Sequence, residues 1–136
     1  MSNKDFEVKQ ILKAYRKGII SESMLQEQME ELSKGGLNVA NVLVHKGTQV
    51  AKLQETPMSQ TVAFTLPAGY AGDKENTHKG DQIIYAIEGS VTARVSGKEQ
   101  DLKAGDLLMI PAGAPHTLRT DGESFFGFTI LAPPEL

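Results

Sequence analysis

The spacing of glycine, proline and histidine residues in the middle of this chain limits what it can fold into more than any other feature. The stretch 104–116 reads Ala-Gly-Asp-Leu-Leu-Met-Ile-Pro-Ala-Gly-Ala-Pro-His. Gly105 stands six positions before Pro111, and His116 stands five positions after it. Four apolar residues between a Gly-Asp pair and a Pro-x-Gly-x-Pro-His run are typical of a short strand between two tight turns, and the full pattern is difficult to obtain by chance.

This stretch and the segment before it, 67–89, resemble the two signature motifs of the cupin family. The second cupin motif, which is Gly, five residues, Pro-x-Gly, two residues and His, is complete here. The first motif, which is Gly, five residues, His-x-His, three or four residues, Glu, six residues and Gly, is altered. In cupins the histidines and the glutamate of these motifs hold one divalent metal inside a small β-barrel. The resemblance covers roughly residues 40 to 132 and puts Asn76, His78, Gln82 and His116 at the four ligand positions.

The apolar pattern divides the chain at Gly35-Gly36. Before this pair, apolar residues recur at helical i, i+3, i+4 spacing, which predicts two short helices with a boundary near residues 18–22. Gly18 suits a helix C-terminus, and Ser21 or Ser23 can cap the second helix. A hairpin this short cannot bury both of its apolar faces, so we expect it to dock on the rest of the chain or on another subunit. A DNA-binding helix-turn-helix is disfavoured, because the second helix is acidic and a third helix is missing.

After the glycine pair the pattern changes to that of strands. Runs rich in β-branched and aromatic residues predict strands at 39–44, 50–53, 61–66, 82–88, 91–95, 107–110, 116–120 and 124–131. Ser96-Gly97 and Asp121-Gly122 are expected to be hairpin tips, since glycine tolerates the positive φ of such turns. We therefore predict an all-β fold, a cupin (jelly-roll) β-barrel over residues 37–136, preceded by an N-terminal two-helix hairpin over residues 1–36.

Strand alternation indicates which side chains share a face. Gln82, Ile84, Ala86 and Glu88 are expected on one side of their strand, and His116, Leu118 and Thr120 on one side of theirs. The strand that begins at Gln82 is apolar on both sides. Its outer side is therefore expected to be covered by the helical hairpin or by a partner subunit, and we predict a homodimer.

Composition narrows the classes of function. The 136 residues are 40% hydrophobic and 23% charged, which fits one globular unit. The sequence has no cysteine, which excludes disulfides, thiolate metal ligands and cysteine nucleophiles. No apolar stretch approaches membrane-spanning length and no leader-like segment opens the chain, so we expect a cytoplasmic protein without a membrane partner. The net charge of −3 argues against nucleic acid as the main partner.

The four ligand positions differ in how well they suit a metal. His78 and His116 are the strongest candidates, because imidazole nitrogen binds Fe, Mn, Ni, Cu or Zn. Gln82 replaces the family's glutamate and can coordinate through its carbonyl oxygen, but it cancels none of the metal's charge. Asn76 replaces a histidine and is the weakest candidate, since an amide at such a place is more often a turn residue. The alternative is that all four are polar residues that line an empty pocket.

Other residues near the motifs are weaker candidates for ligands of a metal or for contacts with a substrate. A set of neutral ligands binds metal less tightly than a set with a carboxylate, and it favours an anionic substrate. Asp73 and Glu75 can supply a carboxylate only if their loop curls inward. Tyr70, Tyr85 and Arg94 are candidates for contacting a substrate carboxylate or phosphate, and they are equally natural as packing or surface residues.

Two hypotheses for function follow. The first is a cupin that binds a divalent transition metal and acts on a small molecule, which can be anionic. Its reaction stays unassigned, because the fold hosts many chemistries and the sequence identifies no proton-transfer residue. The second is a non-catalytic cupin that serves as a small-molecule-binding or oligomerisation module.

Overall fold

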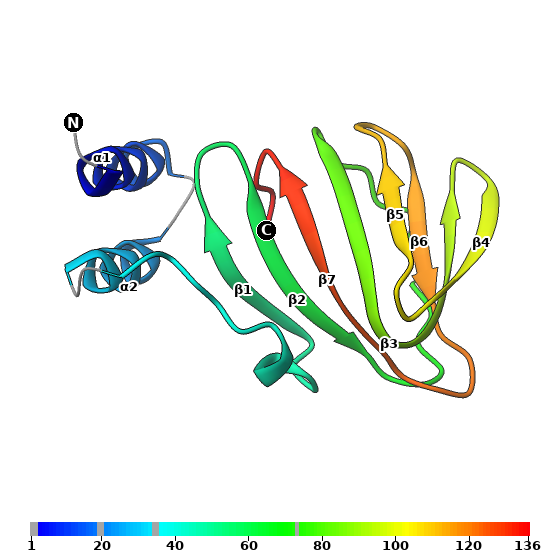
Figure 1. Ribbon diagram of the computed structural model, residues 1–136. Coiled ribbons are helices and arrows are strands. Elements are labelled where there is room, and N and C mark those ends of the chain that lie inside the picture. The colour runs from blue at the N-terminus through cyan, green and yellow to red at the C-terminus, as the bar shows by residue number, and fades with distance from the viewer. Residues whose placement is uncertain (1–2, 19–20, 34–35, 73) are drawn as a thin grey trace.

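In the computed structural model of the protein, residues 3–18, 21–33, 36–72 and 74–136 are described. Helices α1 (Asn3–Arg16) and α2 (Glu22–Ser33) come first, followed by a 3-10 helix (Leu43–His45). The strands that follow are β1 (Val50–Glu55), β2 (Gln60–Leu66), β3 (Asp81–Val95), β4 (Lys98–Lys103), β5 (Leu107–Ile110), β6 (His116–Arg119) and β7 (Phe125–Ala132). Figure 1 shows the two helices side by side at one end of the molecule, beyond the edge strand β1. The prediction of a predominantly β fold after the helices is confirmed.

Strand β3 is long enough to belong to two sheets. Its first half lies between β7 and β5, and its second half lies between β4 and β6. The first sheet continues from β7 through β2 to β1, and every pairing is antiparallel. A bulge between Ala86 and Glu88 interrupts the pairing of β3 with β7 and bends the strand. Two antiparallel sheets that share a bent strand are consistent with a jelly roll, and within the described ranges no pairing joins the end strands β1 and β4.

The space between the two sheets holds the apolar core. Gln82, Ile84 and Ala86 all point into it, as the alternation of β3 predicts. Glu88 was predicted on the same face but is exposed, because the bulge shifts the alternation by one residue. The buried members of the core come from β2, β3, β4, β5 and β7: Phe64, Leu66, Ile84, Ala86, Val91, Ala93, Leu102, Ile110 and Phe125.

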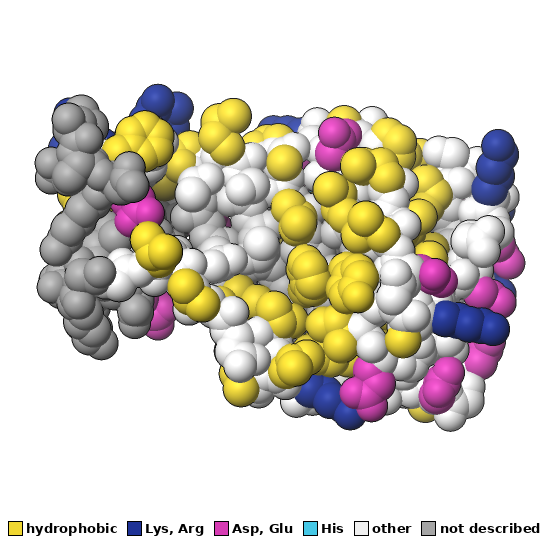
Figure 2. Space-filling model, viewed as in Figure 1, with side chains coloured by type: hydrophobic (Ala, Val, Ile, Leu, Met, Phe, Trp, Pro, Cys, Tyr) yellow, Lys and Arg dark blue, Asp and Glu magenta, His cyan; other side chains and the backbone are white. Residues whose placement is uncertain are grey.

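The outer side of the first sheet is also apolar. Tyr85 packs on Phe128 with ring centroids 5.5 Å apart, and Leu107 and Met109 of β5 are 68% and 53% exposed. Figure 2 shows hydrophobic side chains gathered over this part of the molecule. The hairpin was one of two predicted covers, but it lies beyond β1 and leaves this side open. A partner subunit stays a prediction as the other cover.

The strand predicted at 39–44 is wrong. Its apolar side chains are exposed, with Val39 81% and Val44 73% accessible. The side chain of Asn41 accepts a hydrogen bond from the Leu43 amide at 3.0 Å, and the His45 amide donates to the Val42 carbonyl at 3.1 Å. These local bonds start the 3-10 helix, because an asparagine side chain offers the backbone an alternative to a ladder.

Three predicted turns have different outcomes in the structure. The predicted break at Gly89 is absent, and β3 runs through this residue. A Cβ on Gly89 would lie 1.9 Å from the Ser124 carbonyl oxygen, so glycine allows the backbone of β3 to approach the backbone at Ser124 closely. The tip at Ser96-Gly97 is confirmed and joins β3 to β4, a mostly polar strand that the sequence did not predict. Asp121-Gly122 is not a hairpin tip, because β6 pairs with β3 and not with β7.

The helical boundary is confirmed. Gly18 has a φ of 73°, and Ser21 caps α2 through its hydroxyl, which accepts from the Met24 amide at 3.2 Å. Ile11 and Ala14 of α1 are buried against α2 in a cluster of their own, separate from the core between the sheets. The predicted division at Gly35-Gly36 involves Gly35, which lies outside the described residues. None of the helices described is long and apolar enough to cross a membrane.

Candidate functional site

A cavity of about 240 Å³ opens between the two sheets. Apolar side chains of β2, including Val62, Phe64 and Leu66, form one wall. The opposite part is polar and brings together all four positions predicted from the sequence, with one lysine beside them: Lys74, Asn76, His78, Gln82 and His116. The structure therefore puts residues from the loop before β3, from β3 itself and from β6 into one site.

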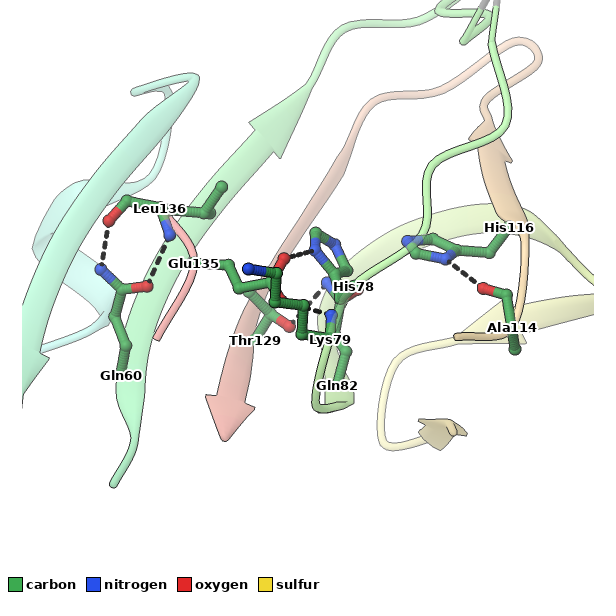
Figure 3. A network of polar contacts seen from close by, with 9 residues as sticks. All are labelled: Gln60, His78, Lys79, Gln82, Ala114, His116, Thr129, Glu135 and Leu136. Carbon is green, nitrogen blue, oxygen red and sulfur yellow. Dashed lines mark hydrogen bonds and ion pairs between the residues drawn. The ribbon is translucent and has the colours of Figure 1, made fainter. Parts of the chain in front are cut away.

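The two histidine rings lie side by side, and in each ring Nδ1 has a hydrogen-bond partner. Their ring centroids are 5.1 Å apart. His116 Nδ1 lies 3.1 Å from the Ala114 carbonyl oxygen, and His78 Nδ1 lies 2.8 Å from a carboxylate oxygen of Glu135 (Figure 3). Carbonyl and carboxylate oxygens only accept hydrogen bonds, so each Nδ1 carries the proton. In a neutral imidazole the Nε2 lone pair is then free, and this is the form that binds a metal.

Burial keeps His116 in this neutral form. The side chain is 5% exposed. Burial lowers the pKa of His116; the bond to the Ala114 carbonyl opposes this shift, and the neighbouring His78 adds to it. The imidazole of His116 therefore stays uncharged at neutral pH, and its free nitrogen is available as a ligand.

Gln82 carries a buried oxygen without a partner. Its Nε2 donates to Thr129 Oγ1 at 3.0 Å, and that hydroxyl in turn donates to the Ile83 carbonyl at 2.9 Å. The amide is thereby fixed, because only its nitrogen can donate to a hydroxyl whose proton is already used. Gln82 Oε1 is left buried with no hydrogen-bond partner among the described residues. An unpaired buried acceptor costs free energy unless a ligand or a water satisfies it.

Comparison with known proteins identifies the fold. The family model described as Cupin domain matches residues 62–126. Three solved structures share the fold: TT1209 from Thermus thermophilus (26% identity, TM-score 0.63, covering 73% of this chain and 100% of that one), KdgF from Halomonas sp. (21%, 0.59, 63% and 78%) and BH2720 from Bacillus halodurans (20%, 0.64, 72% and 82%). Residues 62–126 therefore form a cupin domain. Among curated proteins nothing matches.

This cupin domain departs from the family's pattern in the chemistry of its ligand positions. Asn76 is tied to His116 by two backbone hydrogen bonds of 2.9 Å, which aligns the loop before β3 with β6. Within the described residues no group of three His, Cys, Asp or Glu side chains is placed to hold a metal. A metal at this site would therefore need the amide oxygen of Gln82 beside the two histidines, and ligation by any of the four positions stays a prediction.

Among the weaker candidates, the structure places one at the cavity and the other described ones away from it. Tyr70 lines the cavity, whereas Tyr85 lies on the outer side of the sheet and Arg94 is exposed. Glu75 is exposed and does not line the cavity. Asp73 lies outside the described residues.

Glu135 is the residue that sequence analysis missed. It lies 57 positions after His78 and beyond the last predicted strand. No spacing rule connects it to the motifs, and only the path of the chain after β7 brings it to His78. The Pro133-Pro134 pair before it, which ends the strand, was the one available signal that the chain turns there.

Proposed function

We propose that this cupin binds one divalent transition metal through His78, His116 and Gln82 and presents it to a small molecule in the cavity. The observation that carries the proposal is the state of the three side chains. Within the part of the chain that the structure describes, both imidazoles have a hydrogen-bond partner at Nδ1 and none at Nε2, and Gln82 has a buried oxygen without a partner. All three line one cavity.

The donor set fits a first-row metal. Two imidazole nitrogens with one amide oxygen suit Fe, Mn, Ni, Cu or Zn, and Asn76, which also lines the cavity, is the weaker fourth candidate. Such a metal would act as a Lewis acid on a bound oxygen. The chain's own residues would hold and orient the small molecule, with the apolar wall of β2 excluding water from one side of it.

We infer that the small molecule is anionic. The proposed ligands are neutral and would leave the charge of the metal uncompensated. Lys74 also lines the cavity and adds a positive charge to its polar end. The volume of about 240 Å³ lies below the range of about 300–1,000 Å³ usual for drug-sized ligands, which favours a small acid over a larger molecule.

The test is metal content and affinity in protein purified without chelator or metal-affinity resin. Wild-type protein is expected to contain close to one metal per chain, and His78→Ala and His116→Ala are expected to contain little. His45→Ala is the matched control, because His45 belongs to the 3-10 helix and does not line the cavity. Full metal content in His116→Ala, or none in wild-type protein after soaking, would refute the proposal.

A non-catalytic oligomerisation module is the second candidate function, and the open apolar face favours it. Leu107 and Met109 are exposed there beside Tyr85 and Phe128. We propose that two copies pair through this face, because exposed apolar patches commonly mark interfaces. Light scattering should find a dimer in the wild type and a monomer for Met109→Lys, whereas Met58→Lys, at another exposed methionine, should stay dimeric. A monomeric wild type would refute the pairing.

The cytoplasm is the compartment we propose. A chain without cysteine gains nothing from an oxidising environment, so its composition suits a reducing one. Fractionation of cells that express the protein tests this expectation. Recovery of the protein in a secreted fraction would overturn it.

A further inference from the structure

The residues after β7 fold back onto the mouth of the cavity. Leu136 lines the cavity. Its backbone is held on both sides by the buried side chain of Gln60, which accepts from the Leu136 amide at 3.1 Å and donates to the Leu136 carbonyl at 2.8 Å. Gln60 also donates to Glu55 Oε1 at 2.6 Å and is itself 1% exposed. The segment 133–136 is therefore fastened to β2 on one side of the site.

On the other side of the site the same segment is in direct contact with the loop that carries His78. A Cβ on Gly80 would lie 2.1 Å from the Ala132 carbonyl oxygen and 2.3 Å from Pro133 Cδ. Only glycine permits such an approach between the two backbones. The start of the segment 133–136 is thus pressed against residues 78–80, and its position is fixed at both ends.

Between these two anchors lies Glu135, whose carboxylate is shared by several donors of that loop. One oxygen accepts from His78 Nδ1 at 2.8 Å, and the other accepts from the Lys79 amide (Figure 3). The His78 and Glu135 side chains are 18% and 20% exposed, so the contact is largely shielded from water. The Lys79 amide can only donate, so the carboxylate of Glu135 acts as an acceptor toward this loop.

A carboxylate that accepts a hydrogen bond from Nδ1 of His78 has a chemical consequence at the opposite nitrogen of the ring, Nε2. A neutral imidazole exists as two tautomers, and only one of them leaves Nε2 free to bind a metal. Since Glu135 can only accept, it favours the tautomer with the proton on Nδ1. A carboxylate behind a ligand histidine also raises the basicity of its free nitrogen.

We propose that Glu135 is a positioning residue that holds His78 with its proton on Nδ1 and its Nε2 free for a ligand. Glu135 thus supplies, from outside the two motifs, a carboxylate for a site whose Gln82 has none. The effect of Glu135 on metal affinity rests on the metal function proposed above, whereas its effect on the His78 tautomer does not.

Nuclear magnetic resonance of the metal-free protein tests the tautomer directly. Long-range proton–nitrogen spectra at about pH 8, where an ordinary imidazole is neutral, report which ring nitrogen carries the proton. Wild-type protein is expected to have His78 protonated at Nδ1, and Glu135→Ala is expected to show a large population protonated at Nε2. Glu75→Gln is the matched control, because it removes an exposed negative charge from the same loop region and should leave His78 unchanged. An unchanged His78 tautomer in Glu135→Ala would overturn the inference.

Metal titration supplies the second readout. Glu135→Ala is expected to weaken metal binding by about 10- to 100-fold, which is usual for loss of such an outer carboxylate. Glu135→Gln should lose less, because its amide oxygen can still accept from Nδ1. Equal affinity in wild-type protein and Glu135→Ala would overturn the role in binding. If no variant and no wild-type protein binds metal, the proposed function fails, and the tautomer measurement still decides the role of Glu135.

Discussion

Replacing Gln82 with glutamate restores the carboxylate of the family's first motif, and the stability that it costs should be largely recovered when metal is added. Gln82 is 9% exposed, and its Nε2 is the donor to Thr129 Oγ1 at 3.0 Å. The hydroxyl proton of Thr129 is already donated to the Ile83 carbonyl. An ionised glutamate has no proton to donate to Thr129, and the hydroxyl could donate to the glutamate only by giving up its bond to the Ile83 carbonyl.

The size of the effect can be worked out for each condition. Without metal, loss of the hydrogen bond and the unsatisfied acceptors that it leaves should lower the free energy of unfolding by about 1–3 kcal/mol. For a chain of this size each kcal/mol corresponds to about 4 °C in Tm. With metal, the wild type gains about 2.7 kcal/mol at a concentration of 100 Kd. A variant that binds ten times more tightly gains about 1.4 kcal/mol more, which offsets much of the initial loss.

Thermal unfolding followed by circular dichroism, in chelator and across a metal titration, measures both parts. Gln100→Glu is the matched control, because Gln100 is exposed on β4 and makes the same chemical change away from the site. It should respond to metal as the wild type does. If Gln82→Glu gains no more stability from metal than the wild type gains, position 82 does not contribute a ligand and the reasoning fails.

Three further predictions concern the groups around the site. Thr129→Val keeps the shape of the side chain but removes the acceptor for Gln82. Urea unfolding should therefore find a free energy of unfolding lower by about 1–2 kcal/mol, and metal titration should find weaker binding. Unchanged values in both measurements would contradict this prediction. Gln60→Ala releases Leu136, so amide hydrogen exchange at Leu136 should become faster, and unchanged exchange would mean that the segment is held by other contacts. Burial raises the pKa of Glu55 above 4.5, and the bond from Gln60 and the charge of Lys52 only partly oppose this. The folded protein then binds this proton more tightly than the unfolded chain does, so stability should fall as the pH rises from 4.5 through the raised pKa. Glu55→Gln should remove that part of the pH dependence in urea unfolding, and an unchanged slope would refute it.

The part of the site that lies within the motifs could be predicted because strand geometry is local. Gln82 and His116 face the cavity because each stands at an inward position of a strand, and the two-residue period fixes such positions from the sequence. The place of His78 in the site could be predicted because the residue lies only a short distance before β3 along the chain. The tight turn at Ser96-Gly97 was equally local, since two residues with positive φ define it.

The errors arise where a partner far along the chain decides the structure. The polar strand β4 has one buried residue, Leu102, and forms because β3 offers it an edge, which no pattern within β4 reveals. The segment 39–44 has a strand-like composition but no strand beside it, and the side chain of Asn41 turns it into a helical turn. Glu88 is exposed because of a bulge that only the pairing with β7 creates.

The contact between Glu135 and His78 is the most consequential of these non-local contacts, because it decides whether the carboxylate lies among the proposed ligands or behind one of them. A glutamate at position 82 would act on a metal as a ligand and cancel part of its charge directly. Glu135 contacts the far nitrogen of His78, so its charge would reach the metal only through the imidazole ring. The proposed ligands would then remain neutral, and the open side of the site, next to Lys74, would remain positive. Such a division between a neutral ligand set and an outer carboxylate would keep the histidine well oriented and still leave the charge of the metal available to attract an anionic molecule.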